Sequence, residues 1–142
     1  MTPDAITLAA LVILLFPTGY FLLASPAFLL VKLDIPPVTQ LLRGMFNAHL
    51  MMVSIAGAVG TIAFAAAGHL IFAIGIGLLA ALAFWARPRF LRQWDAQLNA
   101  RDAGDTEAVS RLRRLHWVGM LCNAVLLVAI MASIPYIGVK ST

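Results

Sequence analysis

The 142-residue chain is long enough for one domain, and its composition excludes an ordinary soluble one. Hydrophobic residues make up 62% of it and charged residues 11%, whereas soluble domains average about 45–50% and about 25%. The formal charge is +4, and seven of the ten basic residues are arginines between Arg87 and Arg114. Because apolar runs flank this basic segment, it argues against nucleic acid and for a lipid bilayer as the partner.

Four apolar runs predict four transmembrane helices, because about 17–25 apolar residues suffice to cross the hydrocarbon. They cover residues 5–31, 43–67, 70–85 and 115–137. Pro17 predicts a kink in the first, since prolines are tolerated inside membrane helices. The pair Gly68-His69 predicts a tight turn, so the second and third spans should form an antiparallel hairpin.

Residues 86–114 form the sizeable polar segment and predict an Arg-rich loop. Phe90, Trp94 and Leu98 recur every four residues, which is typical of an amphipathic helix lying on a membrane surface. Gly104 should end that helix. The run Asp105-Thr106-Glu107 resembles the start of another, which should continue into the fourth span.

The basic residues also predict the orientation. With four spans, one side of the membrane receives Lys32, Arg43 and the seven arginines of the loop, and the other receives Lys140. Because positive charge stays in the cytoplasm, both termini should lie outside it. Trp85, Trp94 and Trp117 should then mark the cytoplasmic boundary, where indole rings prefer to sit.

The predicted fold is therefore all-α: residues 1–142 form a single polytopic membrane domain, a four-helix bundle with an amphipathic cytoplasmic loop helix. The predicted location is a bacterial inner membrane. Small residues at Ala56 and Gly60, at Gly57 and Thr61, and at Gly68 and Gly75 predict close helix approach. That approach is expected within the bundle or between the protomers of a homo-oligomer.

Polar side chains inside the spans are costly and therefore point to a candidate site. His116, Gly119 and Asn123 share one face of the fourth span. Asn47 and His49 lie about 200° apart around the second span, so only one of them can face the fourth. His69 lies at the opposite end, about 30 Å from His49, and cannot join the same site.

His49 and His116 are predicted at similar depth, because both spans begin at the cytoplasmic side. The predicted pocket near the cytoplasmic leaflet is framed by His49, His116 and Asn123, with Arg43 and Arg113 at its mouth and Asn47 as a further polar candidate. Two neutral imidazoles are able to ligate a haem iron or a metal ion, so haem b is the first cofactor to test. A purely structural role for both histidines stays open.

Several runs carry a family resemblance: Ser25-Pro26-Ala27-Phe28, Met45-Phe46-Asn47-Ala48-His49, Arg87-Pro88-Arg89, and the run from Arg113 through Leu115-His116 to Asn123. They resemble a family of small four-helix membrane proteins of unknown function, typified by the eukaryotic transmembrane protein two-hundred-and-five. A weaker likeness is to the anthrone-oxygenase-like membrane proteins, which have a histidine at the start of the last span. The resemblance implies the four-helix fold and no settled activity.

Function is narrowed but not fixed by these patterns. Every acidic residue lies in a loop or near the N-terminus, which argues against a proton-driven transporter. The first hypothesis is a membrane protein whose intramembrane pocket binds haem, a metal or a small apolar ligand. The alternatives are an accessory or assembly subunit of a larger membrane complex, and a small membrane oxidoreductase or isomerase acting on an apolar substrate. Catalytic residues and enzymatic activity are left open.

Overall fold

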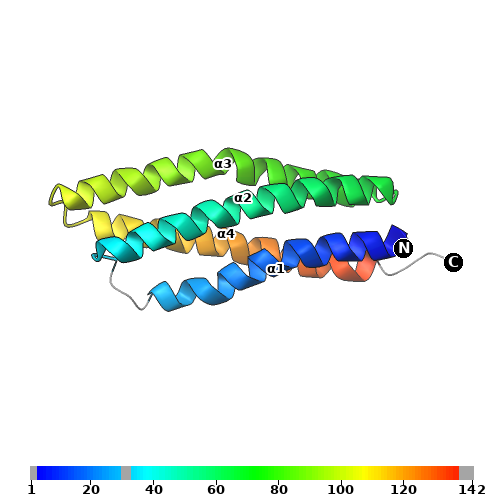
Figure 1. The fold of residues 1–142 in the computed structure, drawn as a ribbon, viewed down its shortest axis with the longest axis horizontal. Helices are drawn as coiled ribbons and strands as arrows, with labels where there is room; N and C mark the ends of the chain where they lie inside the picture. The colour runs from blue at the N-terminus through cyan, green and yellow to red at the C-terminus, as the bar shows by residue number, and fades with distance from the viewer. Residues whose placement is uncertain (1–2, 30–32, 138–142) are drawn as a thin grey trace.

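The computed structural model describes residues 3–29 and 33–137, without the side chains of residues 3–4, 22, 24–29 and 133–137. This part of the chain forms four helices: α1 (Pro3–Leu29), α2 (Pro36–Ala66), α3 (Leu70–Asp102) and α4 (Ala108–Ile137). The helices run alternately in opposite directions, so that α1 begins and α4 ends at the same end of the bundle (Figure 1). The predicted all-helical fold is confirmed.

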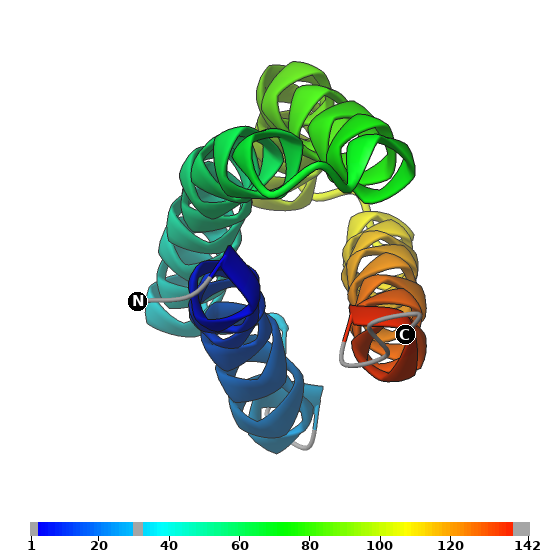
Figure 2. The ribbon, with the colours of Figure 1, turned by 90° about the vertical axis from the view of Figure 1, so that its right-hand side faces the viewer.

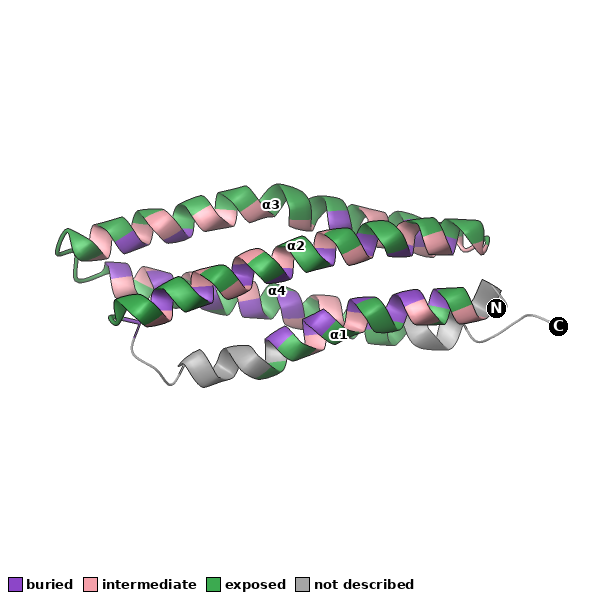
Figure 3. Ribbon diagram, viewed as in Figure 1, coloured by how far each residue is buried: buried purple, intermediate pink, exposed green. Residues whose placement is uncertain are grey.

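The helices form a ring in chain order (Figure 2). α2 packs against α1 and α3, and α4 packs against α3 and α1, with the smallest interface between α3 and α4. Each helix therefore has two neighbours and leaves a wide face uncovered. Over much of their length those faces are apolar: Phe16, Leu23 and Ile71 are among the most exposed side chains, and exposed residues line the outside of every helix (Figure 3).

Within the described residues, three helices are long and apolar enough to cross a membrane: α2, α3 and the stretch Ala108–Ala132 of α4. α1 contributes a shorter apolar stretch, Ala5–Phe21. Because large apolar side chains cover the outer surface as well as the core, a lipid bilayer is the environment that this bundle fits.

Both predicted turns are present, and each is made by a glycine in the left-handed region. Gly68 has φ +83° and Gly104 has φ +94°, which residues with a Cβ rarely adopt. After Gly104, Asp105 accepts a hydrogen bond from the backbone N–H of Glu107 at 2.9 Å, as the predicted helix start requires. That N–H and the bonded Arg111 guanidinium hold the pKa of the Asp105 carboxyl below its usual value.

The segment after Trp85 differs from the prediction. No separate loop helix lies on a membrane surface; α3 continues without a break from Leu70 to Asp102 and is about 50 Å long. Pro88 lies inside it and removes one backbone donor without ending the helix. The predicted continuity of the later helix is confirmed, since α4 begins at Ala108 and runs on to Ile137.

The amphipathic pattern of Phe90, Trp94 and Leu98 has a different cause from the predicted one. Trp94 is fully buried and Leu98 nearly so, in a cluster that continues the bundle beyond Trp85. This cluster, the charged-end core, comprises Phe21, Leu33, Leu42, Phe46, Trp94, Leu98 and Leu112. Trp94 is therefore covered by protein rather than exposed on the surface, whereas Trp85 and Trp117 are more than half exposed.

The small residues of α2 pack within the bundle, as predicted for two of the three pairs. A Cβ added to Gly57 would lie 2.7 Å from the Cβ of Ala80 on α3, and Thr61 contacts Gly77. Gly60 faces Ile76. The pair Gly68 and Gly75 makes no such contact, because Gly68 forms the turn and the space beside Gly75 is open.

Candidate functional site

A polar layer crosses the bundle between two apolar cores. On one side lies the charged-end core, and on the other lies a cluster of Ala10, Leu11, Leu14, Phe64, Ala73 and Ile130. The side chains between them that form the layer are Thr18 of α1, His49 of α2 and Asn123 of α4, which are all buried. Three helices thus each contribute one polar residue to the same level.

Thr18 is positioned by the bend in α1, which is visible near the middle of that helix (Figure 1). Pro17 lacks the N–H that would bond the carbonyl one turn earlier, which favours a kink there. The hydroxyl of Thr18 donates to the carbonyl oxygens of Leu14 and Leu15, at 3.0 and 2.8 Å, and so satisfies itself within α1. The kink predicted at Pro17 agrees with the structure.

Asn123 ties α4 to this bend. Its Nδ2 donates to the backbone carbonyl oxygen of Thr18 at 2.9 Å, in a buried bond between residues 105 positions apart. The carboxamide oxygen of Asn123 receives no hydrogen bond of ordinary geometry from the described residues. A buried acceptor of this kind is costly unless something satisfies it.

His49 lies beside that oxygen. Its ring stacks on Phe21, with centroids 4.1 Å apart and an interplanar angle of 16°. Its side chain is within hydrogen-bonding reach of the Asn123 side chain. A histidine held flat against a phenyl ring has a fixed orientation, so the imidazole and the carboxamide form a preorganised polar pair.

A cavity of about 320 Å³ opens next to this pair, between α2, α3 and α4. His49 and Asn123 supply its polar side chains, and its wall is otherwise apolar apart from the thiol of Cys122. The remaining lining residues are Phe46, Leu50, Val53, Leu79, Leu82, Ala83, Ala86, Phe90, Val118, Gly119 and Leu126. This is the composition and the lower size range of small-molecule sites, which are mostly apolar with a few orienting polar groups.

The cavity opens sideways rather than towards water. Leu82 of α3 and Val118 and Cys122 of α4 line it and are also exposed on the outer surface of the bundle. They flank the α3–α4 seam, which is the smallest helix interface in the ring. The cavity therefore borders the outer surface of the bundle at this seam.

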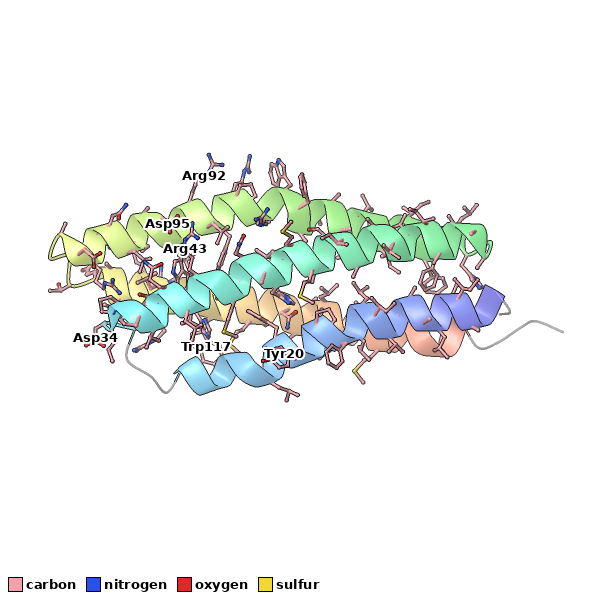
Figure 4. The ribbon with its side chains drawn as sticks, in the orientation of Figure 1. Tyr20, Asp34, Arg43, Arg92, Asp95 and Trp117 are labelled. Atoms are coloured by element: carbon pink, nitrogen blue, oxygen red, sulfur yellow. The ribbon has the colours of Figure 1, made fainter. Side chains whose placement is uncertain are left out.

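His49 also borders a second cavity of about 160 Å³, on the α1–α2 side. Its wall includes Pro17, Tyr20, Phe21 and Met45. Tyr20 is largely exposed on the outer surface of α1 (Figure 4). The imidazole thus lies between two spaces that both face the lipid side of the bundle.

His116 is placed apart from this site. It is fully buried, but it does not line the cavity, and its ring meets Phe46 edge-on with centroids 5.5 Å apart. Phe46 also contacts Phe21, the ring on which His49 stacks. The structure therefore brings His49 and Asn123 together at one cavity and places His116 against Phe46.

The other predicted pocket residues also lie elsewhere. Arg43, expected at the pocket mouth, forms a two-pronged ion pair with Asp95 of α3, at 2.5 and 2.7 Å (Figure 4). Asn47 accepts a hydrogen bond from the Nε of Arg87 at 2.8 Å on the α2 face that packs on α3. Arg113 is exposed on α4. Helical geometry separates Asn47 from His49 as predicted, and Asn47 faces α3, where Arg87 binds it.

These placements do not fit the predicted haem or metal cage. The described residues contain no group of three or more His, Cys, Asp or Glu side chains that could hold a metal ion. The predicted ligands His49 and His116 do not share a cavity. What the residues do form is an apolar chamber with one imidazole and one carboxamide.

Sequence reasoning missed Thr18, Phe21 and Phe46 as site residues. Their side chains or backbone fix the ligand-facing pair, yet each looks ordinary in an apolar helix. Pro17 is the available signal, because a proline inside a helix predicts a bend.

No family model, no curated protein and no solved structure matches this chain. The resemblance to the small four-helix membrane family therefore stays a prediction. The case for function rests on the geometry of the bundle.

Proposed function

We propose that this chain is a four-span membrane protein that binds a small apolar ligand taken from the bilayer. The observation that carries the proposal is the lateral cavity beside His49 and Asn123, apolar in its wall and polar at one point. Binding of this kind draws on burial of apolar surface, and the two polar side chains would fix the orientation of the ligand.

The proposed topology places both termini outside the cytoplasm of a bacterium, in its inner membrane. The charged side chains from Asp34 to Arg114 lie in the half of the bundle away from the α2–α3 turn. Since about 20 helical residues cross the hydrocarbon, the 31 residues of α2 and the 33 of α3 extend beyond it on that side. The cavity then lies just inside the cytoplasmic leaflet.

Photo-crosslinking in nanodiscs tests this proposal. A linear alkane carrying a diazirine is added to the purified protein, and labelled residues are mapped by mass spectrometry. We expect saturable labelling at the cavity wall, around Leu82, Val118 and Cys122, that excess unlabelled alkane competes away. The matched variants are Ala83→Phe, which fills the cavity, and Ala65→Phe, which adds the same bulk to an exposed position of α2.

The expected result is loss of cavity labelling in Ala83→Phe and retention in Ala65→Phe. Non-saturable labelling spread over the lipid-facing surface, unchanged by Ala83→Phe, would remove the proposal. A Soret band in the purified protein, lost in His49→Ala, would assign the site to haem instead.

A further inference from the structure

We infer that the ligand of this cavity carries a neutral hydroxyl group, which binds between Asn123 and His49. This inference deepens the proposed function and rests on it. The ligand class is an aliphatic or isoprenoid alcohol, with a hydrocarbon chain in the cavity and one hydroxyl at the polar pair.

The hydrogen bonds that Asn123 already makes determine which group a ligand must supply. A carboxamide offers two N–H donors and one acceptor oxygen. One N–H of Nδ2 donates to the Thr18 carbonyl, whereas Oδ1 is buried and receives no hydrogen bond of ordinary geometry from the described residues. The open position is therefore an acceptor, and a ligand that satisfies it must bring a donor.

His49 is the other member of the polar pair. A neutral imidazole has one N–H donor and one acceptor nitrogen, and here the ring is fixed against Phe21 beside Asn123. A hydroxyl oxygen can accept from a ring N–H while its proton is donated to Asn123 Oδ1. A hydroxyl is the smallest neutral group that satisfies both residues together, whereas a carbonyl or an ether supplies no donor.

The charge of the cavity wall and the depth of His49 also favour a neutral hydroxyl group. The described residues that line the cavity include no charged side chain, so an ammonium or carboxylate head would be buried there without a counter-ion. His49 lies two residues along α2 from Asn47, about 3 Å deeper than the Arg87–Asn47 bond. This is the depth at which a lipid-like alcohol keeps its hydroxyl near the interface and its chain in hydrocarbon.

A set of three diazirine probes of equal chain length tests the inference: a terminal alcohol, its methyl ether and the plain alkane. All three are compared in nanodiscs of one lipid composition, by the concentration at which cavity labelling saturates. We expect the alcohol to saturate at about tenfold lower concentration than the ether and the alkane, because the ether cannot donate to Asn123 Oδ1.

Two variants locate the effect. Asn123→Leu should abolish the preference for the alcohol while the alkane still labels the cavity. Because this variant also loses the bond to Thr18, His49→Phe serves as the second: it keeps a ring against Phe21 and should reduce the preference severalfold.

The outcomes separate the inference from the proposed function. If the alkane labels the cavity saturably and the alcohol has no advantage, or keeps its advantage in both variants, the hydroxyl inference is wrong and the apolar site stands. If none of the probes labels the cavity saturably, the proposed function fails and the inference fails with it.

Discussion

At the scale of single residues, the site depends on a glycine that leaves room for an aromatic ring. A Cβ added to Gly119 would lie 2.5 Å from Cε1 of Phe46. Phe46 in turn contacts Phe21, Trp94 and His116, so its position is shared by the charged-end core and by the ring that supports His49. The absence of a side chain at Gly119 therefore helps to place the imidazole of His49.

Gly119→Ala should destabilise the protein, because Phe46 must move and its ring would lose its present contacts with Phe21, Trp94 and His116. Overpacking of this kind costs about 1–3 kcal/mol, which a thermal or denaturant unfolding curve in mild detergent will show. Gly75→Ala is the matched control, since nothing lies within 4 Å of an added Cβ there and alanine favours a helix. Equal stability of the two variants would show that Phe46 is not held as described.

At the scale of helices, α2 and α3 are joined by contacts along their whole length. Near their turn they approach closely through Gly57 and Ala80, and at the charged end Arg43 and Asp95 form a two-pronged ion pair. Between these points Arg87 bonds Asn47. The bonds of Arg87 and Asp95 thus hold α3 against α2 on both sides of Pro88.

The Arg43–Asp95 pair should contribute measurably to this arrangement. The side chains are 35% and 42% exposed, so we expect a coupling of about 0.5–1 kcal/mol, at the upper end for surface pairs because the geometry is bidentate. A double-mutant cycle of Arg43→Ala and Asp95→Ala measures it by unfolding at low salt. The exchanged pair, Arg43→Asp with Asp95→Arg, should recover part of the stability lost in either single reversal. If the stability effects of Arg43→Ala and Asp95→Ala are simply additive, the ion pair does not contribute to the stability of the protein.

At the scale of the whole molecule, charge and apolar surface divide the bundle into two halves. The half near the α2–α3 turn presents mainly apolar side chains, whereas the other half carries the charged side chains from Asp34 to Arg114 and a core of its own around Trp94. The arginines there are only partly free for lipid headgroups. Arg43, Arg101 and Arg111 are engaged within the protein, while Arg89 stacks over Trp85.

The proposed topology predicts which end of the bundle is accessible from outside the cell. In a Cys122→Ser background, Ala66→Cys reports on the α2–α3 turn and Thr106→Cys reports on the α3–α4 turn. A membrane-impermeant maleimide should label Ala66→Cys in intact cells and Thr106→Cys only after permeabilisation. The reverse pattern would invert the orientation and place the cavity in the outer leaflet.

Much of the architecture follows from local sequence. Apolar runs, the glycines of both turns and the capping Asp105 act within a few residues, so the helix order and the hairpins could be predicted from them. The separation of Asn47 from His49 followed equally from helical periodicity. Length and hydropathy do not require a partner helix, which is why these predictions were reliable.

Only the tertiary structure decided which polar residues meet. His49 and Asn123 share a cavity while His116 does not, because the rotation of each helix is set by side chains on its neighbours, such as Phe46 against Gly119. The burial of Trp94 is a similar case, since an amphipathic pattern predicts an apolar face and does not say whether lipid or protein will cover it. Both the pairing of His49 with Asn123 and the burial of Trp94 depend on packing between residues distant in sequence, which no local pattern encodes.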